Sequence, residues 1–148
     1  ISEVTRTRAL VDECAAELKA EGVPYSRFDL GVMIETPAAV LIAPALAKEV
    51  AFFSIGTNDL TQYIMAADRL NPTVAKLNDV TNPAVMMAIG LTAKAGVAAG
   101  IMVGMCGEAA GRPDLIPAFI EMGLTELSMS PASIQRAKKT ITAMAAGG

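Results

Sequence analysis

Short apolar runs that end abruptly in polar residues recur along this chain. There are four of them, at residues 30–34, 51–55, 101–105 and 126–129. Runs of this length, bounded by turn-forming residues, are typical of strands buried on both faces. The clearest is 51–55, which is followed almost at once by the polar pair Asn58 and Asp59. The pattern predicts strands that deliver polar side chains at their carboxyl ends.

The segments around these runs carry apolar residues at helical spacing, or begin with residues that cap or open helices. The predicted helices span residues 5–20, 37 to 47 or 48, 57–66, 83–98, 113–122 and 131 to about 144. Residues 25–29 are a predicted loop, and 68–82 form a long irregular segment with two Asn-Pro pairs, which mark turns. Residues 145–148 are a predicted frayed end.

The order is therefore one helix followed by four strand-helix units. Strands separated by crossover helices run parallel, so the fold class is α/β. Four such units make either the C-terminal half of a (β/α)8 TIM barrel or a small open sheet. In both architectures the carboxyl ends of the strands share one rim, where active sites lie. The residues expected on that rim are Glu35, Asn58, Asp59, Cys106, Glu108 and Ser130.

Composition narrows the class of protein. Of 148 residues, 53% are hydrophobic. The net charge is -3, and there is no run of Lys or Arg. This charge pattern argues against nucleic acid or an anionic membrane as the main partner. No apolar run reaches the roughly 18 residues of a spanning helix, and the start does not resemble a signal peptide. The two cysteines do not suggest a disulfide framework, so a reducing cytoplasm is expected. The chain begins with Ile rather than Met, which favours a fragment of a longer chain.

The absence of histidine excludes Ser-His and Cys-His catalysis within the chain, and any phosphohistidine on it. Neither a Gly-x-Gly-x-x-Gly pattern nor a Walker lysine motif is present, so no ATP site is visible.

Two carboxylates at strand ends, Glu35 and Asp59, favour a magnesium site, because Mg²⁺ takes few protein oxygens and keeps waters or substrate oxygens. The alternatives are a charge at a helix N-terminus for Glu35 and a helix cap for Asp59. Neither strand before these acids carries a charge, which shifts the balance toward metal.

Three other residues have functional and plain structural interpretations. Asn58 can hold a carboxylate or phosphate, or simply occupy a turn. Arg69 can bind an anion bidentately, or be a solvated charge or a partner of Asp68. Cys106 can transfer a proton, but as a free cysteine its residue type alone favours a small buried hydrophobe.

Several motifs nevertheless resemble, in the same order, the phosphoenolpyruvate (PEP)-binding barrel of the PEP-utilizing enzymes. They are GVMIETPAA (31–39), FFSIGTNDLTQ (52–62), MAADR (65–69), GMCGE (104–108) and LSMS (127–130). The resemblance covers nearly the whole chain. It is strongest to the enzyme I group of the bacterial sugar phosphotransferase system, the PEP–protein phosphotransferases, and weaker to pyruvate phosphate dikinase and PEP synthase.

The resemblance implies binding of PEP and Mg²⁺, transfer of phosphate to a histidine on another domain and then to the carrier HPr, and release of pyruvate. It implies that Glu35 and Asp59 bind the metal, that Asn58 and Arg69 hold the phosphate, and that Cys106 protonates the enolate carbon. The last role reverses the interpretation from residue type alone. Members of the group are dimers through this domain, so a homodimer is expected.

The chain departs from the family by matching only the C-terminal portion of the barrel. Residues 1–148 are therefore expected to lack the N-terminal phosphohistidine and HPr-binding domains and the arginines of the earlier half-barrel, so that the fragment alone is inactive. Two alternatives remain: a piece of a dikinase or synthase, which would carry a nucleotide-binding domain upstream, and a non-catalytic scaffold piece.

Overall fold

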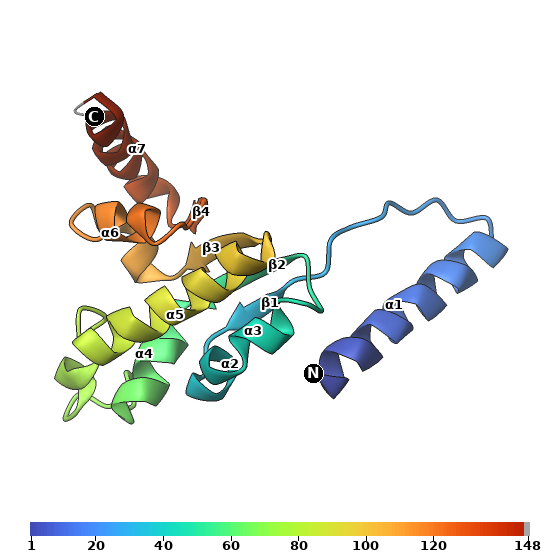
Figure 1. Cartoon of the computed structure of the whole chain (residues 1–148), viewed down its shortest axis with the longest axis horizontal. Helices are drawn as coiled ribbons and strands as arrows, with labels where there is room; N and C mark the ends of the chain where they lie inside the picture. The colour runs from blue at the N-terminus through green and yellow to red at the C-terminus, as the bar shows by residue number, and fades with distance from the viewer. Residues whose placement is uncertain (147–148) are drawn as a thin grey trace.

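A parallel four-stranded sheet organises the chain, as the sequence predicts (Figure 1). The computed structural model describes residues 1–146. The strands are β1 (Val32–Ile34), β2 (Phe52–Gly56), β3 (Met102–Cys106) and β4 (Glu126–Ser128). They pair in chain order, each parallel to the next. The predicted α/β class with consecutive strand-helix units is confirmed. A parallel sheet paired in chain order is consistent with part of a (β/α) barrel.

Helices connect and flank the strands. They are α1 (Ser2–Ala20), α2 (Pro37–Leu41), α3 (Ala43–Leu46), α4 (Thr57–Met65), α5 (Pro83–Ala99), α6 (Ile116–Glu121) and α7 (Pro131–Ala146), with short 3-10 turns at η1 (Ala75–Leu77) and η2 (Glu108–Gly111). No helix within residues 1–146 combines the length and apolarity needed to cross a membrane.

Prolines explain two differences from the predicted helices. The single helix predicted after residue 37 is split at Ile42, whose backbone leaves the helical region, because Pro44 cannot donate a backbone hydrogen bond and instead opens α3. The helix predicted from residue 113 begins only at Ile116, where Pro117 occupies its first turn. Helix α7 also extends through Ala146, so the predicted frayed end is wrong for residues 145 and 146; residues 147 and 148 lie outside the described part.

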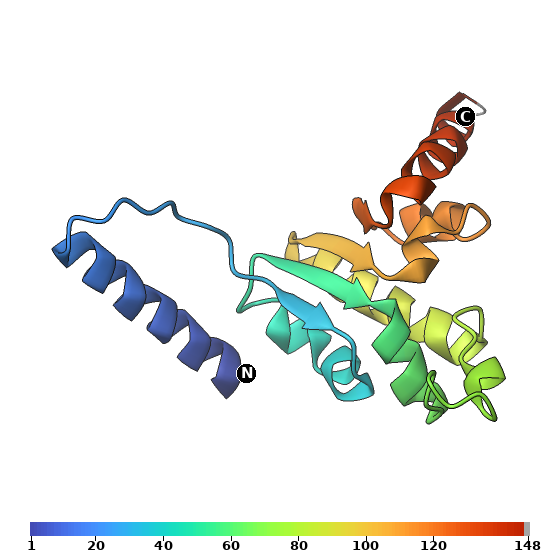
Figure 2. The ribbon, with the colours of Figure 1, turned by 180° about the vertical axis from the view of Figure 1, so that it is seen from behind.

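One face of the sheet is covered by helices and forms the core. The strand side chains Ile34, Phe53, Ile55, Val103 and Met105 are at most 1% exposed on that face. They belong to one apolar cluster with buried residues of α3 and α5, and helix α5 lies behind β2 and β3 in the view of Figure 2. Burial of this face holds the strands in register, and so sets the positions of the residues at their ends.

The opposite face of the sheet is not covered by any described helix, and Figure 2 shows it toward the viewer. Register places Met33, Ser54, Gly104 and Glu126 in one row across this face. Met33 is 48% exposed, and the Glu126 carboxylate lies directly over Gly104. Strands β1 and β4 are the edges of the sheet, and no further strand among residues 1–146 pairs with their outer sides. The sheet is therefore open in the way expected of half a barrel.

Helix α1 stands beside the body of the domain at the end of an extended segment (Figures 1 and 2). It has no buried residue, and Leu10 on its apolar stripe is 51% exposed. The Arg8 guanidinium ties it to the body by bonding both the carboxylate and the backbone carbonyl of Glu49. The helix is confirmed, but none of its apolar side chains is fully buried; Val4 is partly buried and packs against the core.

Candidate functional site

The carboxyl ends of the strands form one rim, as the parallel topology requires. Gly56 pairs with Cys106, and Cys106 with Ser128. Because Ile34 pairs with Ile55, Glu35 falls in the same row, next to Gly56. Cys106 is the last residue of β3 rather than the residue after it, so its side chain belongs to the open face. Glu35 and Cys106 thus flank Gly56 on one side of the sheet.

The Glu35 side chain lies against the backbone at Gly56. A β carbon built on Gly56 would lie 3.0 Å from Glu35 Cβ and 3.1 Å from Glu35 Oε2. The absence of a side chain at Gly56 lets the carboxylate lean toward the end of β2, where Asp59 follows in the first turn of α4. Both acids are partly buried at neighbouring strand ends.

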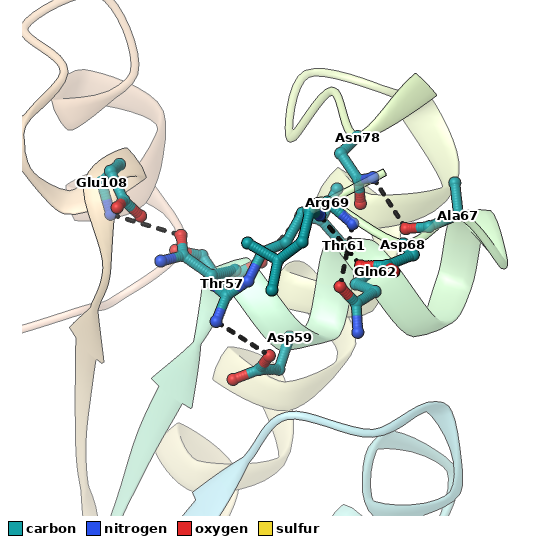
Figure 3. A network of polar contacts seen from close by, with 11 residues as sticks. Thr57, Asp59, Thr61, Gln62, Ala67, Asp68, Arg69, Asn78 and Glu108 are labelled. Carbon is teal, nitrogen blue, oxygen red and sulfur yellow. Dashed lines mark hydrogen bonds and ion pairs between the residues drawn. The ribbon is translucent and has the colours of Figure 1, made fainter. Parts of the chain in front are cut away.

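Asp59 and Arg69 form an ion pair. Arg69 Nη2 lies 3.4 Å from Asp59 Oδ1, and the two side chains are 42% and 39% exposed (Figure 3). The backbone N–H of Arg69 donates to Gln62 Oε1 at 3.0 Å, which anchors the start of the irregular segment to α4. Asp68, the alternative partner, instead accepts a hydrogen bond from the Leu70 N–H at 2.9 Å. The candidate anion-binding residue therefore touches a candidate metal ligand.

Asn58 connects the ends of β2 and β3. Its Oδ1 accepts a hydrogen bond of 3.4 Å from the backbone N–H of Glu108, and Figure 3 shows Glu108 facing the start of α4 across the rim. The backbone of Glu108, rather than its exposed carboxylate, makes this contact. The Asn58 Nδ2 group is the part of the amide that remains to donate to an anion.

Thr57 is a buried polar residue at the rim that no sequence pattern singled out. It is 1% exposed, and its hydroxyl donates to the backbone carbonyl of Cys106 at 3.0 Å. The two residues are 49 positions apart, so no local pattern could reveal the bond.

Two cavities open at the rim. The first, about 380 Å³, is lined by Cys106, Gly107, Glu108, Gly111, Ser128, Met129, Ser130 and Ser133. The second, about 310 Å³, is lined by Thr57, Asn58, Thr61, Arg69, Asn78, Asp79, Val80, Glu108, Ala109 and Arg112. Glu108 belongs to both, and Glu35 and Asp59 to neither. The structure brings Asn58 and Arg69 into one cavity and places Cys106 in the other, on opposite sides of Glu108.

A second arginine, Arg112, lines the cavity with Arg69. It holds Asp114 by two bonds, Nε to Oδ1 at 3.2 Å and Nη2 to Oδ2 at 2.5 Å. This pairing raises the pKa of Arg112 and lowers the pKa of Asp114. The pKa of Asp79 on the same wall is lowered mainly by the Thr81 hydroxyl. Arg112 keeps its positive charge at any pH of interest, but in this arrangement Asp114 neutralises it.

The donor set at the ends of β1 and β2 fits magnesium. Glu35 and Asp59 supply hard carboxylate oxygens, and Mg²⁺ is typically held by one or two carboxylates together with waters or substrate phosphates. Residues 1–146 contain no group of three or more His, Cys, Asp or Glu side chains arranged around one point. An ion at this site would therefore keep several coordination positions for other ligands.

Comparison with known proteins decides the family. Residues 1–146 match the family described as PEP-utilising enzyme, PEP-binding domain. The chain belongs to this family. Similar curated members of the PEP-utilising enzymes are the proteins named phosphoenolpyruvate-protein phosphotransferase from Streptococcus equinus, 50% identical over 139 residues, and from Haloferax volcanii, 45% identical over 141 residues. A third, of the same name, is from Lactococcus lactis, 47% identical over 135 residues.

These matches cover 93%, 95% and 90% of the chain, but only 24%, 25% and 24% of the relatives. The chain spans about a quarter of the length of the curated relatives it matches. Membership of the PEP-binding domain family agrees with the partial (β/α) sheet and with the resemblance described from the sequence.

Proposed function

We propose that this chain is the C-terminal portion of the PEP-binding barrel of a PEP–protein phosphotransferase of the enzyme I group. In that enzyme it binds PEP and Mg²⁺ while phosphate is transferred to a histidine elsewhere and pyruvate is released. The names of the relatives favour this proposal over a dikinase or synthase.

The observation that carries the proposal is the joining of the ends of β2 and β3. Thr57 bonds the Cys106 carbonyl, and Asn58 Oδ1 receives the Glu108 N–H. These contacts tie the start of α4, which carries Asn58 and Asp59, to the turn that follows Cys106. A substrate with a phosphate near its reacting carbon needs phosphate-binding groups and a proton donor on neighbouring elements.

Each residue has a distinct task in the proposed reaction. Asn58 Nδ2 and the Arg69 guanidinium bind and orient the phosphate, and stabilise its charge during transfer. The bond from phosphorus to the enol oxygen of PEP breaks as a bond from phosphorus to the acceptor nitrogen forms, leaving the enolate of pyruvate. Cys106 then gives its thiol proton to the methylene carbon: the S–H bond breaks, a C–H bond forms, and the thiolate is reprotonated by solvent.

The metal contributes positive charge. Bound Mg²⁺ neutralises charge on the phosphate oxygens. Glu35 and Asp59 are the residues that would hold it, and Gly56 gives Glu35 the room to lean toward that place. The Arg69 partner of Asp59 would then be available to the phosphate.

The chain depends on other parts of the protein in this proposal. It has no histidine, so the acceptor lies elsewhere, on a domain that also meets the carrier HPr. The open sheet face and free edges of β1 and β4 suit closure by the other half of a barrel, which would supply further substrate-binding cations. The isolated chain is accordingly expected to be inactive, and the complete protein to be a cytoplasmic homodimer.

Calorimetric titration of the complete protein with PEP, with and without Mg²⁺, tests the proposal. Wild type should bind PEP with an affinity that rises with Mg²⁺, and Glu35→Ala and Asp59→Ala should each remove the Mg²⁺ dependence. The exposed Glu13→Ala variant on α1 is a matched control that should behave like wild type. Equal Mg²⁺ dependence in all four proteins contradicts the metal site. Unchanged pyruvate formation by Cys106→Ala contradicts the proton-donor role.

A further inference from the structure

Thr57 is a buried polar side chain at the junction between β2 and α4. Buried hydroxyls in folded proteins nearly always have a hydrogen-bond partner. The partner of the Thr57 hydroxyl is the carbonyl of Cys106, at 3.0 Å, on the neighbouring strand. The bond therefore reaches across the sheet to the residue that carries the thiol.

The turn after Cys106 packs closely on the same junction. Gly107 has φ of 105°, and a β carbon there would overlap Thr57 Oγ1 and lie 3.0 Å from Asn58 Oδ1. The next residue, Glu108, donates its N–H to Asn58. The peptide units on the C-terminal side of Cys106 are thus held from one direction by the first turn of α4.

That first turn is itself fixed. Thr61 is 4% exposed, and its hydroxyl donates to the carbonyl of Thr57 at 2.7 Å. Leu60 in the same turn is fully buried in the core. Because Thr57 belongs to this fixed turn, its hydrogen bond holds the Cys106 carbonyl at a fixed position relative to α4.

We infer that Thr57 is a positioning residue for the Cys106 thiol. This inference rests on the proposed function, in which Cys106 protonates the enolate. The hydroxyl fixes the peptide plane between Cys106 and Gly107, and with it the direction of the Cys106 Cα–Cβ bond over the open face. Thr57 does not bind substrate through this hydroxyl, which is committed to the carbonyl.

Proton transfer to carbon is sensitive to this geometry. Reacting atoms need to be about 3–3.5 Å apart and aligned, and a misplacement of about 1 Å can lower a rate ~10²-fold. Replacing the hydroxyl by a methyl group of the same shape removes the bond but keeps the packing. Thr57→Val is therefore expected to lower kcat for pyruvate formation about 10- to 100-fold, with the KM for PEP little changed.

Thr92 provides a matched control. It is fully buried on α5, and its hydroxyl donates to the Ala88 carbonyl at 3.0 Å, within one helix. Thr92→Val removes a buried threonine hydroxyl bonded to a backbone carbonyl, as Thr57→Val does. It should lower the unfolding temperature comparably but leave kcat at the wild-type value.

The experiment compares Thr57→Val, Thr57→Ser and Thr92→Val in the complete protein, measuring kcat, KM and the stereochemistry of the methyl group formed from PEP labelled at the methylene carbon. The expected result is a lower kcat and a racemised methyl group in Thr57→Val, wild-type behaviour in Thr92→Val, and restoration by Thr57→Ser, which keeps the hydroxyl. Wild-type kcat and stereochemistry in Thr57→Val overturn the inference, as do equal losses in Thr57→Val and Thr92→Val. If Thr57→Val does not fold, Thr57→Ala assayed at lower temperature is judged by the same two outcomes.

A second readout does not require turnover. In a Cys14→Ser background, which removes the exposed thiol, the alkylation rate of Cys106 by iodoacetamide is measured against pH in the complete protein. Thr57→Val should change this rate several-fold, and Thr92→Val should not. Suppose that Thr57→Val changes the alkylation rate but Cys106→Ala forms pyruvate at the wild-type rate. Thr57 then positions the thiol, and the proton-donor role in the proposed function is wrong. An unchanged alkylation rate in Thr57→Val overturns the positioning role itself.

Discussion

Arg69 Nη2 lies 3.4 Å from Asp59 Oδ1, so a candidate phosphate-binding cation is paired with a candidate metal ligand. Both side chains are partly exposed, and pairs of this kind contribute about 0.2–1 kcal/mol. An ion at Asp59 and a phosphate at Arg69 would each replace one half of this pair. Binding of metal and substrate together would therefore break this ion pair and give each of the two side chains a new partner of opposite charge.

The first prediction concerns this exchange. Arg69→Met keeps the length of the side chain and removes the charge that competes for Asp59. Affinity for Mg²⁺ alone, measured by calorimetry, should rise ~1.5- to 5-fold, the equivalent of an exposed pair, while affinity for PEP in the complete protein should fall. Arg136→Met, an exposed arginine on α7, is the control and should change neither. A fall in both affinities would mean that Arg69 supports the metal rather than competing with it.

The second prediction concerns Gly56. A methyl group there would lie 2.9 Å from Met33 Sδ and 3.1 Å from Glu35 Oε2, so Gly56→Ala should push the carboxylate away from the end of β2. The backbone φ of -84° is one that alanine adopts readily, so the fold should be kept. Mg²⁺ affinity should fall toward that of Glu35→Gln, with little loss of circular dichroism signal. Undiminished Mg²⁺ affinity would show that Glu35 reaches the metal by another path, or does not bind it.

The third prediction tests the turn after Cys106. Gly107→Ala combines a positive φ with overlap on Thr57 Oγ1, and should lower the free energy of unfolding by about 1–3 kcal/mol, measured by urea denaturation. Gly100→Ala is the matched control, because Gly100 also has positive φ, 71°, but nothing within 4 Å of its β position. It should cost about 1 kcal/mol, the lower end of the penalty for a side chain in the left-handed region. Equal losses would show that crowding against Thr57 contributes nothing.

The fourth prediction contrasts two glycines of helix α5. A methyl group at Gly96 would overlap Val103 and press on Phe53 at 3.4 Å, so Gly96→Ala should destabilise by about 1–3 kcal/mol through overpacking. At Gly90 the nearest atom, Met122 Sδ, is 4.0 Å away, so Gly90→Ala should stabilise by up to about 1 kcal/mol through helix propensity. Thermal unfolding of the two variants should move in opposite directions. Stabilisation by both would mean that α5 can move away from β3.

The fifth prediction concerns pH. Arg112 lowers the pKa of Asp114 below its ordinary value of 3.8 by hydrogen bonding to the carboxylate. A lowered pKa contributes stability that is present above the ordinary value and is lost as the pH falls through the folded-state pKa. Arg112→Ala should raise the midpoint of the Asp114 carboxyl titration, followed by carbon NMR. Asp79, whose pKa depends chiefly on Thr81, should move much less.

Local sequence patterns predict most of the architecture of this chain. The apolar runs at 30–34 and 101–105 correspond to β1 and β3 within two residues, because a short apolar run bounded by turn-forming residues is typical of a strand. Parallel pairing followed from the intervening helices. The common rim of Glu35, Asp59 and Cys106 followed in turn from parallel pairing, so the candidate residues could be found before any contact was known.

The tertiary structure decided how these residues meet. Nothing near Thr57 in the chain marks the Cys106 carbonyl as its partner, and nothing near Arg69 favours Asp59 over the adjacent Asp68. These bonds depend on the packing of α4 against the turn after β3, and on the path of a long irregular segment. Periodicity reports which side of an element is apolar, whereas the partner of a single hydroxyl or guanidinium is set by the positions of whole elements relative to one another.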